Sequence, residues 1–108
     1  MATYQDFLDA FKPALQDLAK KTLDAYSKQA TTDGQAFLDA QKANLDKWTK
    51  ELVDGELSKA DFKDLVQGIQ DLAELVALKQ AGLAAARLDS FRSSLINLVI
   101  DTAFKVFL

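Results

Sequence analysis

Residues 53–62 read VDGELSKADF and contain the strongest turn signal in the chain. Asp54 and Gly55 suit the end of a helix, because glycine readily adopts the left-handed conformation that follows a last helical turn. Ser58 and Asp61 have the spacing of a helix N-cap, in which the serine hydroxyl accepts a hydrogen bond from a first-turn amide. The stretch therefore predicts that one helix stops here and that another starts directly afterwards.

A heptad pattern precedes this turn. Apolar side chains recur at alternating steps of four and three residues through the first helix, which is the spacing that keeps one stripe against a partner helix, as in a coiled coil. Pro13 lies inside this pattern without changing its phase, so it predicts a bend rather than an end. Residues 31–34 are poor helix formers and mark a possible break. We favour one continuous helix over residues 3–53, because no proline enforces a stop.

A second apolar pattern follows the turn, which we place at residues 54–57. It runs through the second half and past Gly82, an interior breaker whose neighbours are strong helix formers. This predicts one helix over residues 58–107. Each arm would then hold about 50 residues and extend about 75 Å at ~1.5 Å per residue. The sequence thus predicts an all-α fold with one domain over residues 1–108, a long antiparallel helical hairpin.

The C-terminal stretch SSLINLVIDTAFKVFL, residues 93–108, is apolar over most of its circumference. At 100° per residue an arc of roughly 80° holds the side chains of Ser90, Ser94, Asn97, Asp101 and Lys105. One partner helix needs an apolar stripe of only about 100°, and the apolar sector here is far wider. A lone hairpin would leave several large side chains exposed, each worth about 1.5–3 kcal/mol when buried. We therefore expect self-association into a helical bundle, most simply a dimer of hairpins. The predicted oligomer interface consists of Leu88, Phe91, Leu95, Ile96, Leu98, Val99, Ile100, Ala103, Phe104, Val106 and Phe107.

Composition argues against several classes of function. The formal net charge is −3 and the basic residues do not cluster, which disfavours nucleic-acid binding. The chain has no histidine and no cysteine, so it lacks the commonest general base, the usual nucleophile pairs and the usual zinc ligands. Its four glycines never form a phosphate-binding loop. We expect no catalytic, cofactor-binding or metal-ligating residues, and hence no enzyme.

The expected function is a structural or protein-interaction module. Its expected partner is itself, as a homodimer or a higher helical assembly, with another protein as a further possibility. The alternative is a peripheral membrane-associated amphipathic helical protein, although residues 95–108 are shorter than the ~20 apolar residues of a membrane span and contain Asp101. A third hypothesis is a carrier that holds a small ligand in the assembled bundle. The N-terminus has no cationic leader followed by an apolar block, so we expect a cytoplasmic protein.

Overall fold

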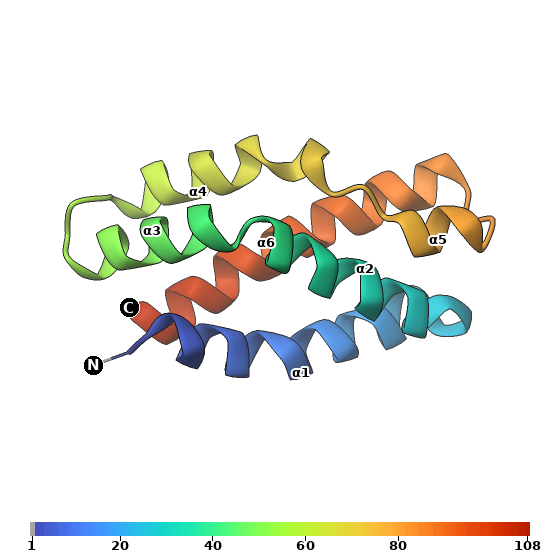
Figure 1. The fold of residues 1–108 in the computed structure, drawn as a ribbon, viewed down its shortest axis with the longest axis horizontal. Helices are drawn as coiled ribbons and strands as arrows, with labels where there is room; N and C mark the ends of the chain where they lie inside the picture. Colours follow the sequence, from blue (N-terminus) through green and yellow to red (C-terminus); the bar gives the residue numbers. More distant parts are fainter. Residues whose placement is uncertain (1) are drawn as a thin grey trace.

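The fold is helical, and the computed structural model describes residues 2–108 without a strand among them (Figure 1). This confirms the all-α prediction. The elements in chain order are α1 (Tyr4–Thr22), the 3-10 helix η1 (Asp24–Tyr26), α2 (Ser27–Ala40), α3 (Lys42–Val53), α4 (Lys59–Gly68), the 3-10 helix η2 (Gln70–Leu72), α5 (Val76–Gln80) and α6 (Ala85–Phe107).

These elements form four antiparallel segments rather than two long arms (Figure 1). The first segment is α1, the second is α2 and α3 with a bend between them, the third is α4 to α5, and the fourth is α6. The longest helix, α6, has 23 residues, and the molecule measures 42 × 23 × 19 Å. The predicted hairpin with arms of about 75 Å is therefore wrong. Each arm folds back once more, which brings the apolar stripes of all four segments into one core.

The first helix, α1, ends at Thr22, well before the break that the sequence suggested near residues 31–34. Leu23 leaves helical geometry with φ −138° and ψ 51°, and its side chain is buried. No glycine or proline lies at this position to stop the helix. The break coincides instead with the burial of the Leu23 side chain. Residues 31–34 lie inside α2, where the hydroxyls of Thr31 and Thr32 donate to backbone carbonyls one turn earlier. The predicted single helix over residues 3–53 is corrected accordingly.

Between α3 and α4 the chain reverses through Gly55, whose φ is +75°. The Oγ of Ser58 accepts a hydrogen bond of 3.1 Å from the amide of Asp61, which caps α4. At the start of the chain, Thr3 and Asp6 form a complete capping box on α1. α1 itself continues through Pro13.

The predicted single helix over residues 58–107 is broken in the structure. α4 ends at Gly68, and residues 73–75 separate η2 from α5 without helical structure. Gly82 then adopts a φ of +88° in the turn that leads to α6. The alanine-rich neighbours of Gly82 favour helix, but the left-handed glycine ends it.

α6 packs against α1, α3 and α4 of the same chain. The ring centroids of Phe104 in α6 and Phe62 in α4 lie 5.8 Å apart. Those of Phe107 in α6 and Phe7 in α1 lie 6.4 Å apart. Of the predicted interface residues, Leu98, Phe104, Val106 and Phe107 are partly buried, and the others are buried: Leu88, Phe91, Leu95, Ile96, Val99, Ile100 and Ala103. The apolar surface that was expected to need a second copy is thus largely covered within one chain, and self-association through it stays a prediction.

Candidate functional site

A buried carboxylate links the middle of α2 to the start of α5. Asp33 is only 6% exposed, and its two oxygens accept hydrogen bonds of 2.9 Å from the amide of Ala77 and 2.8 Å from the amide of Leu78. These amides belong to the first turn of α5, where no intrahelical acceptor exists. Asp33 therefore acts as an N-cap supplied from a different helix, more than 40 residues earlier in the chain.

The residues before α5 carry backbone strain. Leu75 has φ 54° and ψ 47°, the left-handed region, which costs roughly 1–2 kcal/mol for a residue with a side chain. The chain is held on both sides of it. Asp33 binds the amides that follow, and the Nε of Arg92 donates a hydrogen bond of 2.7 Å to the carbonyl of Ala73. Such strain persists where the surrounding structure over-determines it, and it often marks a functional segment.

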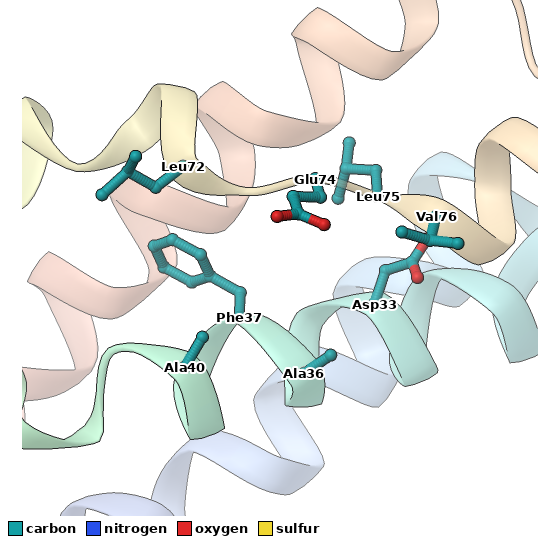
Figure 2. A pocket seen from close by; sticks show the side chains of 8 residues that line it. All are labelled: Asp33, Ala36, Phe37, Ala40, Leu72, Glu74, Leu75 and Val76. Atoms are coloured by element: carbon teal, nitrogen blue, oxygen red, sulfur yellow. The ribbon is translucent and has the colours of Figure 1, made fainter.

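A groove runs between α2 and this strained segment (Figure 2). We call it the linker groove, and its cavity has a volume of about 190 Å³. Two large apolar residues on its edge are exposed, Leu72 at 56% and Val76 at 50%. The carboxylate of Glu74 extends over the groove between them (Figure 2), and neither of the two salt bridges within residues 2–108 includes it. The lining residues are Asp33, Ala36, Phe37, Ala40, Leu72, Glu74, Leu75 and Val76.

A second cavity, of about 200 Å³, lies where α1 begins and α6 ends. Tyr4 and Phe107 contribute to its wall together with side chains of α3. The Tyr4 hydroxyl is buried and has no hydrogen-bond partner among the described residues. Burial, followed by the charges of Asp46 and Asp39, raises the pKa of Tyr4 to about 12 from its ordinary value of 10.0. Tyr4 thus places a buried polar atom without a described partner beside this cavity.

We expect the Tyr4→Phe variant to be more stable than the wild type at neutral pH by about 1 kcal/mol, because the substitution removes a buried hydroxyl without a partner. The wild type should also lose stability as the pH rises from 10 towards 12. Its folded state holds the Tyr4 proton more tightly than its unfolded state does, so the contribution is complete below pH 10 and disappears as the pH passes 12.

Urea denaturation of both proteins across this pH range measures the difference directly. Lysine titration lowers the free energy of unfolding of both proteins alike at high pH. The variant should therefore lose less stability between pH 10 and pH 12 than the wild type, and the difference is the contribution of Tyr4. A variant that is less stable at neutral pH would show that the hydroxyl has a partner after all, such as an ordered water in the cavity.

Two other kinds of functional feature, a metal site and a membrane span, are not found among the described residues. Within residues 2–108 no three acidic, histidine or cysteine side chains gather closely enough to hold a metal ion. No helix among those residues is both long enough and apolar enough to cross a membrane.

Sequence reasoning missed the linker groove. None of the predicted interface residues lines it, because those residues lie on α6 and the groove lies between α2 and residues 72–76. One signal was present: Asp33 and Gly34 are poor residues for the middle of a helix. Their place in α2 indicates a tertiary role, which for Asp33 is the cap of α5.

The chain was also compared with known proteins. No family model, no curated protein and no solved structure matches it.

Proposed function

We propose that this protein is a non-enzymatic interaction module and that its linker groove binds an apolar segment of another protein. The observation that carries the proposal is the exposure of Leu72 and Val76 on the edge of a cavity. Large apolar side chains that remain exposed beside a concave surface are typical of protein-binding sites. The partner would cover both side chains and fill the cavity between them.

The groove is also held in shape before any partner arrives. Residues 73–75 are fixed by the hydrogen bonds of Asp33 on one side and of Arg92 on the other. A preformed site costs less conformational entropy on binding than a site that must be ordered first. This supports a binding role for the segment over a role as a flexible loop.

Self-association through α6 is the second candidate. Its support is the end of that helix, where Phe107 is partly buried and Leu108 is 60% exposed. Sedimentation equilibrium at micromolar concentration distinguishes the two candidates. A dimer that is lost in a Leu108→Ser variant would favour α6, whereas a monomer would leave the groove as the binding surface.

The proposal predicts which side chains a partner needs. A displayed library of helical peptides should yield binders of the wild type whose affinity falls at least about tenfold when Leu72 and Val76 are both replaced by serine, the loss expected for removing central apolar contacts. Both side chains are at least half exposed, so the double variant should stay folded.

Leu65→Ser is the matched control. Leu65 is an exposed leucine of α4, 37% accessible, and it does not line the groove. Its replacement should leave the affinity of the same peptides unchanged in fluorescence anisotropy. Binders that tolerate the Leu72 and Val76 replacements would place the interaction elsewhere, and binders that bridge two copies would point to self-association.

A further inference from the structure

The linker groove combines apolar edges with the carboxylate of Glu74, which forms no salt bridge within residues 2–108. Glu74 lies in sequence between Leu72 and Val76, and all three side chains line the same cavity. Figure 2 shows the Glu74 carboxylate between the ring of Phe37 and the side chain of Val76. A partner that covers both exposed apolar side chains therefore also approaches this carboxylate, which lines the same cavity.

Removing water from a carboxylate is unfavourable unless a cation or hydrogen-bond donors replace the water. The groove itself supplies no cation, because its charged lining residues are Asp33 and Glu74. Asp33 already uses both oxygens on the amides of α5, so it adds negative potential and has little capacity to help Glu74. Lys79, one helical turn after Val76, is not among the lining residues.

On the basis of the proposed function, we infer that the partner segment carries a lysine or arginine among its apolar residues, and that this cation pairs with Glu74. The apolar residues of the segment cover Leu72 and Val76, and the cation enters between them. Arginine suits this position best, because its planar guanidinium binds a carboxylate through two parallel hydrogen bonds. The ion pair with Glu74 would provide specificity, and the apolar contacts with Leu72 and Val76 would provide most of the affinity.

The test is a charge exchange between protein and peptide. One peptide selected against the wild type is synthesised in three forms that differ at a single central position, which is Arg, Gln or Glu. Each form is titrated against the wild type and against Glu74→Lys at one fixed salt concentration, with fluorescence anisotropy as the readout. Glu56→Lys is the control, because it makes the same change in net charge at an exposed residue of the turn between α3 and α4, away from the groove lining.

The wild type should bind the Arg form about tenfold more tightly than the Glu form, with the Gln form in between. Glu74→Lys should reverse that order, and Glu56→Lys should keep it. If the three forms bind the wild type equally, or if Glu74→Lys leaves the order unchanged, the inference is wrong even though the groove binds apolar segments. If no selected peptide depends on Leu72 and Val76, the proposed function itself fails, and the inference fails with it.

Discussion

Replacing Asp33 by alanine should lower the free energy of unfolding by about 3 kcal/mol. The Asp33 carboxylate accepts two hydrogen bonds, each worth roughly 1.5–3 kcal/mol. Removing the carboxylate leaves the amides of Ala77 and Leu78 without acceptors. The new cavity adds to the cost because the side chain is buried. For a chain of this size the midpoint of thermal unfolding should fall by more than about 10 °C.

Asp39→Ala is the matched control, since Asp39 belongs to the same helix and is exposed. Its effect on stability should stay within about 0.5 kcal/mol. Asp33→Asn should lie between the two, because one carbonyl oxygen remains to accept one of the two amides. Urea denaturation gives the stabilities, and hydrogen exchange at Ala77 and Leu78 shows whether the loss begins at α5. Equal effects for Asp33→Ala and Asp39→Ala would contradict the capping role.

Replacing Gly34 by valine should also destabilise the fold by about 3 kcal/mol. A Cβ built on Gly34 would lie 2.7 and 2.8 Å from the Cδ atoms of Leu15, which is closer than real contacts allow. Leu15 is fully buried in α1 and has little room to move away. Overpacking of a close-packed core typically costs about 1–3 kcal/mol, and the two further methyl groups of valine bring the loss to the upper end.

The same substitution at Gly68 serves as the control. Gly68 is the last residue of α4 and has open space around it, so Gly68→Val should change stability by less than about 0.5 kcal/mol. A Leu15→Ala replacement should make room beside Gly34, so the double variant should be more stable than the sum of the two single losses predicts, by about 1 kcal/mol or more. Strict additivity would show that α1 and α2 do not meet at these two residues.

The fold class was readable from the sequence because helix propensity and capping are local properties. The capping box of Thr3 and Asp6 and the N-cap at Ser58 are formed by neighbours in the chain, and the structure contains both. The long hairpin was wrong because the number of reversals depends on contacts between distant residues. Leu23 ends a helix without any local stop signal, and the alanine-rich stretch around Gly82 turns in spite of its helix propensity.

The candidate site was less predictable for the same reason. Asp33 and Gly34 looked like helix breakers when judged by propensity alone. In the structure Asp33 caps another helix and Gly34 admits a side chain of α1, so both residues are explained only by partners far along the chain. The apolar pattern of α6 indicates more than one neighbouring helix, but the sequence could not show that α1, α3 and α4 of the same chain cover much of it.

The bond between Asp33 and α5 also constrains the order in which the molecule can form. It closes a loop of more than 40 residues, and contacts of such long separation form after local helices because the entropy of loop closure must be offset first. The linker groove is built from both ends of that loop. It therefore exists only once α2 and residues 72–76 have come together, so a partner of the kind proposed would bind only molecules in which this long-range contact has formed.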